Sequence, residues 1–273
     1  MRKKRPKSQR SSGTGTKKRP LRSFVPWLVA GIVILVALIG WSWTSIRRPI
    51  SPTVPESVPE NAVSLGIVDQ FYSQTPSFTD QLVTFLEEHE VTYHVHKDAE
   101  VTVELYRKLP TFGYTLLILR VHAGVLKFQN EETALFTSEQ YNTYEYWAEQ
   151  FLDQVGSGFM GDTLEDPVFT INPRFVTECM QGNFSETTII LSSCWGLHNT
   201  ILAKTFIGKG ASVFIGWDER VELGHTDRAT LTLLEGLLSD QLTVTEAVDR
   251  VMSEVGTDRL WGSSLKCYPH GHV

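Results

Sequence analysis

A histidine and a cysteine each follow an apolar run that is typical of a buried strand. The first run, YTLLILRV (residues 114–121), leads into a His-Ala-Gly sequence that begins at His122. The second run, TTIILSS (187–193), leads into Cys194. In α/β proteins, reactive groups gather at the carboxyl ends of the strands. If these two strands are neighbours, the imidazole and the thiol face one cleft.

This pair of side chains suits nucleophilic catalysis. The thiolate, not the thiol, attacks a carbonyl, and an unperturbed cysteine has a pKa of about 8.5. A nearby imidazole can take up the thiol proton and later give it to a leaving amine. We also expect a helix to begin near Cys194, where its N–H groups and dipole would favour a thiolate and an oxyanion. Gly124 leaves room for a substrate carbonyl beside the backbone.

Each residue also has a purely structural interpretation. His122 alone is compatible with a hydrogen-bonded histidine at a strand end. Cys194 alone is compatible with a small buried side chain, because free cysteine is among the most buried residue types. Their joint placement after successive buried strands favours the catalytic interpretation.

Other residues are expected to border the same cleft. Trp195 follows the cysteine, and Trp217 ends a third apolar run, ASVFIGW (211–217). These indoles either wall a substrate groove or pack on the edge of the sheet. Asp218 and Glu219 come next, and they either select a basic substrate side chain or are solvated loop acids.

Cofactors are not required by this chemistry, and the sequence predicts neither a metal nor an organic group. Two histidine pairs have spacing that suits metal ligands, but exposed histidines of this kind are more often unliganded. Cys179 and Cys267 are either two packed thiols or one disulfide, which the sequence does not decide. The histidine pairs are His94 with His96 and His270 with His272.

Strand and helix patterns alternate from residue 63 onward, which predicts an α/β fold with a mostly parallel sheet and helices on both faces. The spacing predicts strands over 63–72, 91–97, 114–123, 187–194 and 211–217, a hairpin over 125–138, and helices over 77–90, 101–110, 172–182, 199–210, 225–240 and 243–255.

The order strand, His-x-Gly, strand, Ser-Ser-Cys, helix resembles the caspase-like cysteine peptidases, a group that includes caspases, legumain, clostripain, gingipains and separase. The resemblance covers about residues 63–255. It implies a flavodoxin-like strand order, with His122 as general acid/base and Cys194 as nucleophile. It also implies that backbone N–H groups of Cys194 and of the Ala123–Gly124 segment hold the oxyanion. The usual His-Gly pair is His-Ala-Gly here, so the oxyanion donor is expected to be displaced by one residue. The Gln-Ala-Cys context of caspases is absent.

The N-terminal region predicts a membrane anchor. Residues 1–23 form a basic tail with ten Lys or Arg, and residues 24–46 are almost wholly apolar. About 20 apolar residues span a bilayer core. The positive-inside rule places the N-terminus in the cytoplasm, so residues 47–62, a Pro-rich linker, and the α/β domain of residues 63–273 would lie outside. A cleaved signal peptide and a buried core helix are the alternatives. The same arrangement resembles prokaryotic membrane-anchored proteins with caspase-like domains.

Charge narrows the choice of partners. Residues 49–273 hold 13 Lys and Arg against 31 Asp and Glu. This acidic balance disfavours nucleic acid, which is bound through clustered positive charge. We therefore expect a peptide or protein substrate, and membrane lipid around the N-terminal helix. The sequence does not determine the oligomeric state.

Three functions follow from these observations. The first is a membrane-anchored extracytoplasmic cysteine endopeptidase with a His122/Cys194 dyad. The second is a catalytically inactive caspase-like domain that acts as a binding or scaffold module. The third is a flavodoxin-like sensor, which ranks last because no Gly-rich phosphate loop follows the first strand.

Overall fold

Two sheets organise the part of the chain that the computed structural model describes, which is residues 63–126, 131–160 and 166–269. The chain divides into two units, Met1–Ser51 and Pro52–Val273, and all described residues belong to the second. The predicted tail 1–23, membrane helix 24–46 and linker 47–62 lie outside the described residues. Within the described ranges, no helix combines the length and the apolar character that a membrane crossing needs.

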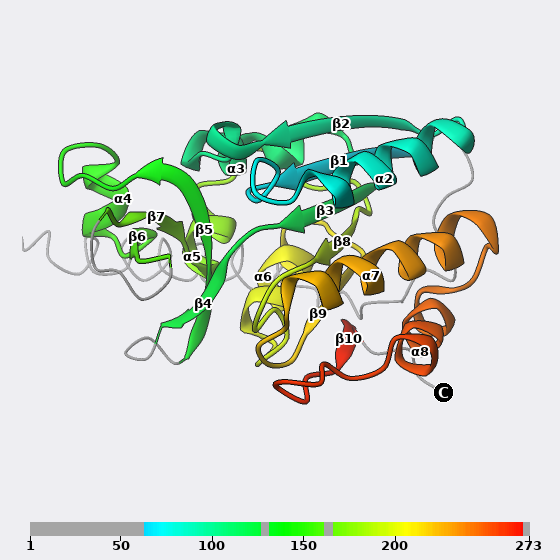
Figure 1. Ribbon diagram of the computed structural model, residues 1–273. Helices are drawn as coiled ribbons and strands as arrows, with labels where there is room; N and C mark the ends of the chain where they lie inside the picture. The colour runs from blue at the N-terminus through cyan, green and yellow to red at the C-terminus, as the bar shows by residue number, and fades with distance from the viewer. Residues whose placement is uncertain (1–62, 127–130, 161–165, 270–273) are drawn as a thin grey trace, which may run out of the picture. The chain divides into compact units, whose positions relative to one another are not determined.

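The larger sheet has six strands in the order β10-β9-β8-β3-β1-β2 (Figure 1). Five strands run parallel and β10 is antiparallel to β9. The prediction of a mostly parallel sheet is therefore confirmed, with β10 as an addition. The strands are β1 (Ser64–Asp69), β2 (Thr92–Lys97), β3 (Leu116–Arg120), β8 (Thr188–Leu191), β9 (Val213–Trp217) and β10 (Leu265–Tyr268).

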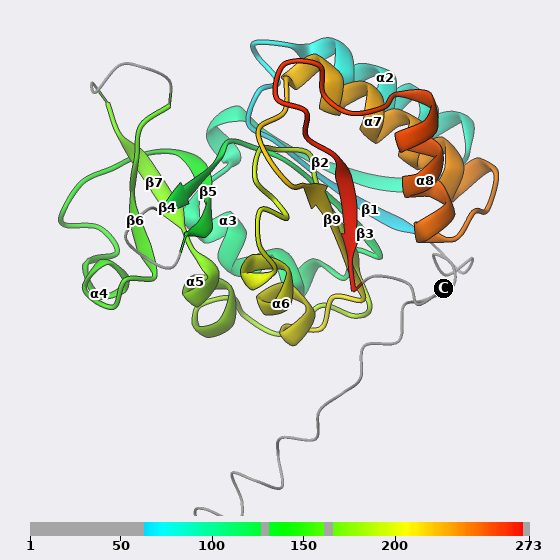
Figure 2. The same cartoon turned by 90° about the horizontal axis from the view of Figure 1, so that it is seen from below.

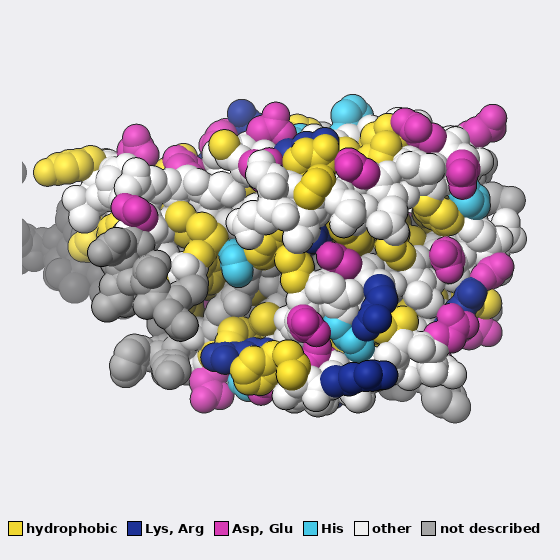
Figure 3. Space-filling view, viewed as in Figure 1, with side chains coloured by type: hydrophobic (Ala, Val, Ile, Leu, Met, Phe, Trp, Pro, Cys, Tyr) yellow, Lys and Arg dark blue, Asp and Glu magenta, His cyan; other side chains and the backbone are white. Residues whose placement is uncertain are grey.

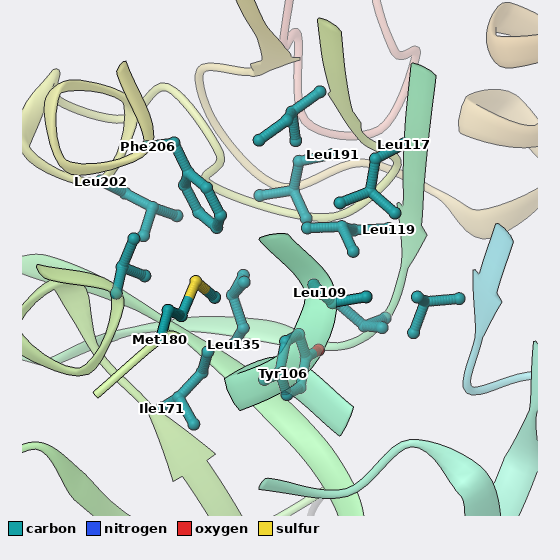
Figure 4. Packing of buried hydrophobic residues seen from close by; sticks show 14 of the residues in the cluster. Tyr106, Leu109, Leu117, Leu119, Leu135, Ile171, Met180, Leu191, Leu202 and Phe206 are labelled. Carbon is teal, nitrogen blue, oxygen red and sulfur yellow. The ribbon is translucent and has the colours of Figure 1, made fainter. Parts of the chain in front are cut away.

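Helices cover both faces of this sheet, as the alternating pattern predicted (Figure 2). On one face, α2, α7 and α8 pack on a cluster that includes Leu82 and Leu233. On the other face, α3, α5 and α6 pack on a cluster that includes Tyr106, Phe175 and Phe206, part of which is seen in Figure 4. The helices are α2 (Pro76–Glu88), α3 (Val103–Lys108), α4 (Trp147–Phe151), α5 (Pro173–Glu178), α6 (Ile201–Gly208), α7 (Leu223–Leu234) and α8 (Val244–Glu254).

Side chains at two predicted helix starts act as caps. The Asn172 side chain accepts hydrogen bonds from the N–H groups of Arg174 and Phe175, at the beginning of α5. Thr243 and Glu246 form a capping box at the beginning of α8. Each cap satisfies N–H groups that the first helical turn leaves without a partner, which fixes where the helix begins.

The smaller sheet has four antiparallel strands in the order β4-β5-β7-β6. The predicted hairpin is present as β4 and β5, whereas β6 and β7 come from a stretch that the sequence did not assign. Only two residues, Val121 and His122, separate β3 in the large sheet from β4 in the small one. His122 therefore lies at the junction of the two sheets. The strands are β4 (Ala123–Leu126), β5 (Glu132–Gln140), β6 (Val155–Gly158) and β7 (Val168–Ile171).

We predict that Leu119→Ala destabilises the protein strongly. Leu119 is fully buried in β3, between β1 and β8. Truncation of a buried leucine costs about 2–5 kcal/mol of unfolding free energy, because it leaves a cavity in addition to the lost transfer energy. Chemical denaturation of the full chain measures this cost. Leu260→Ala is the control, since this side chain is 70% exposed and its truncation is expected to change stability by less than about 0.5 kcal/mol.

Candidate active site

Strand register brings His122 and Cys194 to the same edge of the large sheet. β3 and β8 are adjacent and parallel, with Leu119 opposite Leu191, and the N–H of Ser192 donates to the Leu119 carbonyl at 2.9 Å. His122 and Cys194 each lie three positions beyond this residue pair. The two residues therefore leave neighbouring strands at the same level, as the sequence predicted.

The alternation of side chains assigns the thiol to one face. Ile118 and Ile190 belong to the cluster beneath α2, α7 and α8. Two residues further along their strands, Arg120 and Ser192 contact α7 through hydrogen bonds on the same side. Cys194 comes next in this alternation and packs against the same cluster. The thiol thus lies on the α7 face, at the carboxyl edge of the sheet.

The His122 imidazole is held by its backbone and by two aromatic rings. The backbone N–H of His122 donates to Gln70 Oε1 at 2.8 Å, and the backbone carbonyl of His122 accepts from Phe136 N at 2.9 Å. The Phe71 ring meets the imidazole edge-on with centroids 4.5 Å apart, and the Phe136 centroid lies 6.1 Å away. Burial lowers the pKa of His122, because a charged ring is poorly solvated there. The imidazole is therefore predominantly neutral near pH 7.

The Cys194 thiol contacts the segment that links β9 to α7. Its sulfur accepts from Val221 N at 3.4 Å, and its S–H donates to the Val221 carbonyl at 3.6 Å. Burial is the largest influence and raises the pKa of Cys194; Asp258 and Glu219 act in the same direction, whereas Arg220 opposes them. The cysteine at rest is therefore a neutral thiol.

No hydrogen bond joins the imidazole to the thiol within the described part of the chain. The two groups share an edge of the sheet, and their protonation states are complementary, with a neutral base beside a neutral acid. Hydrogen bonds between catalytic groups are often long or absent before substrate binds. The arrangement suits a proton transfer that accompanies attack on a substrate, rather than an ion pair formed beforehand.

Two backbone N–H groups at this edge of the sheet have no acceptor among the described residues. β4 and β5 pair antiparallel, with Gly124 opposite Ala134, and the Phe136 N–H bonds to the His122 carbonyl in the same ladder. Hydrogen-bonded pairs alternate along such a ladder, so the N–H of Gly124 faces β5 and that of Ala123 faces away from it. The Cys194 N–H has no acceptor among the described residues. The N–H groups of Ala123 and Cys194 are therefore both without an acceptor among the described residues.

Two local expectations about this segment were wrong. A helix does not begin at Cys194: turns follow it, and α6 begins only at Ile201, so no helix N-terminus lies against the sulfur. Gly124 does not keep open space either, because a Cβ there would lie 3.3 Å from the Phe136 ring. The glycine makes room for Phe136, which in turn faces His122.

Of the four residues expected to border the cleft, the structure places Trp195 and Glu219 on a groove, but not Trp217 or Asp218. Trp217 is fully buried, and its Nε1 donates to Thr226 Oγ1 at 2.9 Å, so it packs inside the fold. Asp218 accepts from Ser264 N at 2.8 Å and pairs with Lys266 Nζ at 2.7 Å. Its carboxylate therefore ties β9 to β10 instead of selecting a substrate.

The groove beside Trp195 was not predicted as a whole. It encloses about 680 Å³ between the β4–β5 hairpin, the turn after Cys194 and the segment after β9. In Figure 3, dark-blue and yellow side chains lie together at the lower edge of this face. The residues that line the groove are Val125, Glu131, Trp195, His198, Glu219, Arg220 and Trp261.

A buried ion-pair network lies next to the site and joins β1, β3 and α7. Arg120 is fully buried and donates to both carboxylate oxygens of Asp227 at 2.7 and 2.9 Å, and to Asp69 Oδ1 at 2.7 Å. The same Asp69 oxygen accepts from the N–H of Phe71 at 2.9 Å, and Phe71 contacts His122. The sequence analysis did not predict this network, although a charged residue inside the otherwise apolar LLILRV run is a signal that could have indicated it.

Neither a metal site nor the alternative disulfide is formed in the described residues. No cluster of three or more His, Cys, Asp or Glu there is arranged to hold a metal ion. His270 and His272 lie outside the described residues. Cys179 is a free thiol, and its sulfur lies 3.1 Å from Gln154 Oε1, so it forms no bond with Cys267.

We predict that Arg120→Met destabilises the protein by about 3–5 kcal/mol, because it leaves Asp69 and Asp227 without their counter-charge in a buried place. Urea unfolding of the full chain at pH 7 measures the loss. Arg250→Met is the matched control, since its partners Asp240 and Glu254 are about half exposed and such pairs contribute about 1 kcal/mol or less. Equal losses in the two variants would contradict this account.

Comparison with known proteins adds no family assignment. The chain matches no protein-family model, and no curated protein shows significant sequence similarity to it. The residues at the carboxyl edge of the large sheet are therefore the basis for proposing a function.

Proposed function

We propose that the protein is a caspase-like cysteine endopeptidase that an N-terminal helix anchors in the cell membrane, with its α/β domain outside the cytoplasm. One observation carries this proposal: His122 and Cys194 leave adjacent parallel strands at the same register and the same edge of the sheet. In the caspase-like peptidases, a histidine follows one central strand and the cysteine follows the next. The mixed, mostly parallel sheet between two helical layers is compatible with that family.

The first half of the reaction is acyl transfer to Cys194. As the sulfur attacks the carbonyl carbon of a peptide bond, the neutral His122 imidazole takes up the thiol proton. A C–S bond forms and the carbonyl electrons move to oxygen. The N–H groups of Ala123 and Cys194 stabilise that oxyanion, a type of interaction worth about 3–4 kcal/mol per donor in comparable enzymes. The imidazolium then protonates the amine, and the C–N bond breaks.

The second half is hydrolysis of the thioester. His122 removes a proton from water, which attacks the acyl carbon and forms a second tetrahedral intermediate at the same pair of N–H donors. The C–S bond breaks, and the sulfur recovers its proton from the imidazolium. General acid–base assistance of this kind contributes about 10²–10⁴ in rate. The residues of this chain supply every group that these steps require.

The shifted pKa values determine the protonation states of Cys194 and His122 before substrate binds. Burial raises the pKa of the thiol and lowers that of the imidazole, so both groups are uncharged near pH 7. Proton transfer then occurs during attack, because a thiolate–imidazolium pair is unfavourable in a poorly solvated place.

The membrane anchor follows from the sequence. A basic tail precedes residues 24–46, an apolar segment of bilayer-spanning length, and an acidic domain follows. Lipid around that helix is the proposed membrane partner, and peptides or proteins outside the cytoplasm are the proposed substrates.

A non-catalytic binding domain is the second candidate. It is favoured by the contacts of the thiol, which bonds to the backbone of Val221 in both directions instead of to His122. In that function the groove beside Trp195 would recognise a peptide without cleaving it.

We predict that Cys194→Ala and His122→Ala each abolish peptide cleavage by the full chain in detergent or lipid nanodiscs. The measurement is mass-spectrometric detection of products from a diverse peptide library. Loss of the nucleophile or its base is expected to lower the cleavage rate at least about 10³-fold. Cys179→Ala is the matched control: this residue is the C-cap of α5, outside the site, and its loss should leave cleavage unchanged.

Circular dichroism must show that each variant remains folded. Cleavage that persists in Cys194→Ala would refute the proposal. Absence of cleavage by the wild-type chain, together with iodoacetamide reacting at Cys194 no faster than at Cys179, would favour the binding domain.

A further inference from the structure

The segment between β9 and α7 runs directly across the Cys194 sulfur. Val221 contacts it with both backbone polar groups, and the Val221 side chain is buried in the cluster beneath α7. The residue before it, Arg220, lines the groove beside the site. This segment therefore presents an N–H donor to the reactive atom and places a cation in the adjoining groove.

Two indole rings hold the Arg220 guanidinium in place. Its central carbon lies 4.8 Å from the Trp195 ring centroid and 4.9 Å from that of Trp261. Trp195 is held in place by Glu219: the Trp195 backbone N–H donates to the Glu219 carbonyl at 3.0 Å, and the indole Nε1 donates to the Glu219 carboxylate. Stacking of this kind covers the faces of a guanidinium and leaves its edge N–H groups for an anion.

Among the described residues, the Arg220 guanidinium lacks the hydrogen-bonding partners that the acids around it have. No carboxylate of the described residues forms an ion pair with its guanidinium. Glu219, by contrast, accepts from Trp195 and from the N–H of Arg220 at 3.0 Å. Asp258 accepts from the N–H groups of Glu222, Leu260 and Trp261 at 2.8–3.0 Å. The two acids near the sulfur are thus satisfied by backbone and indole donors, whereas the cation is not.

The other usual sources of thiolate stabilisation do not reach Cys194. The nearest following helix, α6, begins at Ile201, and turns lie between it and the cysteine. His122 is neutral and is not hydrogen-bonded to the sulfur within the described residues. The remaining positive charge that acts on the thiol is that of Arg220.

We propose that Arg220 and the N–H of Val221 form an anion site against the Cys194 sulfur, which stabilises the thiolate and attracts electrophiles that carry a negative charge. This inference rests on the proposed function, because that function makes the sulfur the nucleophile. In it, Arg220 offsets part of the electrostatic cost that burial imposes on the thiolate.

Two alkylating reagents of nearly equal size test the site without any substrate. Iodoacetate carries a carboxylate and iodoacetamide is neutral. With each, the cysteine sulfur displaces iodide: a C–S bond forms, the C–I bond breaks, iodide leaves with the electron pair, and the thiol proton passes to solvent. The ratio of the two rates at one cysteine reports the local charge, and Cys179 supplies an internal reference in the same folded chain.

We predict that the iodoacetate-to-iodoacetamide rate ratio is about tenfold higher at Cys194 than at Cys179, and that Arg220→Met removes this preference. Arg220→Met should also raise the pH midpoint of iodoacetamide labelling at Cys194 by about one unit, which is a tenfold lower thiolate fraction near neutral pH. Arg220→Lys should restore part of both effects, because it keeps the charge but not the planar stacking group.

The charge-matched control is Arg228→Met, which removes an exposed arginine of α7 and should leave the ratio and the midpoint unchanged. Unaltered Cys179 labelling shows in each variant that the fold is retained. Arg220→Met with the wild-type ratio and midpoint would overturn the anion site. The proposed peptidase is tested separately, because a failure of that function appears as absent cleavage or as cleavage that survives Cys194→Ala.

Discussion

The parallel pairing of β3 with β8 is the constraint on which the site depends. Side chains alternate between the two faces along a strand. A slip of one residue between these strands would therefore turn the Cys194 thiol to the face of the sheet opposite the one it now occupies. The register is strongly specified because both faces of β3 and β8 are buried against helices. Backbone hydrogen bonds then continue one step past the ladder, from Ser192 to Leu119, and carry that register to the edge of the sheet.

Burial of Arg120 connects this constraint to the histidine. A guanidinium inside the fold is favourable only when its donors are satisfied, and Asp69 and Asp227 satisfy them from β1 and α7. The same Asp69 positions the backbone of Phe71, whose ring lies against His122. Gln70 adds the hydrogen bond that holds the His122 N–H at the corner where β3 becomes β4. The buried network therefore positions the His122 imidazole through the packing of the core.

Much of the large sheet was predictable from sequence because its central strands are continuous apolar runs that alternate with segments of helical periodicity. β6, β7 and β10 were missed because each is a four-residue strand in a stretch without a clear repeating pattern, and β6 is a Val-Gly-Ser-Gly sequence without strand character. The sequence left two roles open for Trp217 and for Asp218, because chain position alone does not distinguish a side chain at the end of a strand that faces the core from one that faces solvent. Arg220 was missed because its partner Trp261 is distant in the chain.

Positions 122 and 194 lie side by side at one edge of the sheet, and chemical cross-linking tests this proximity directly. A His122→Cys variant is treated with a short thiol-reactive cross-linker, and the full chain is then analysed by mass spectrometry. We expect an intramolecular bridge between the introduced thiol at position 122 and Cys194, with none to Cys179 at the end of α5. Single adducts at both positions without a bridge would contradict this proximity.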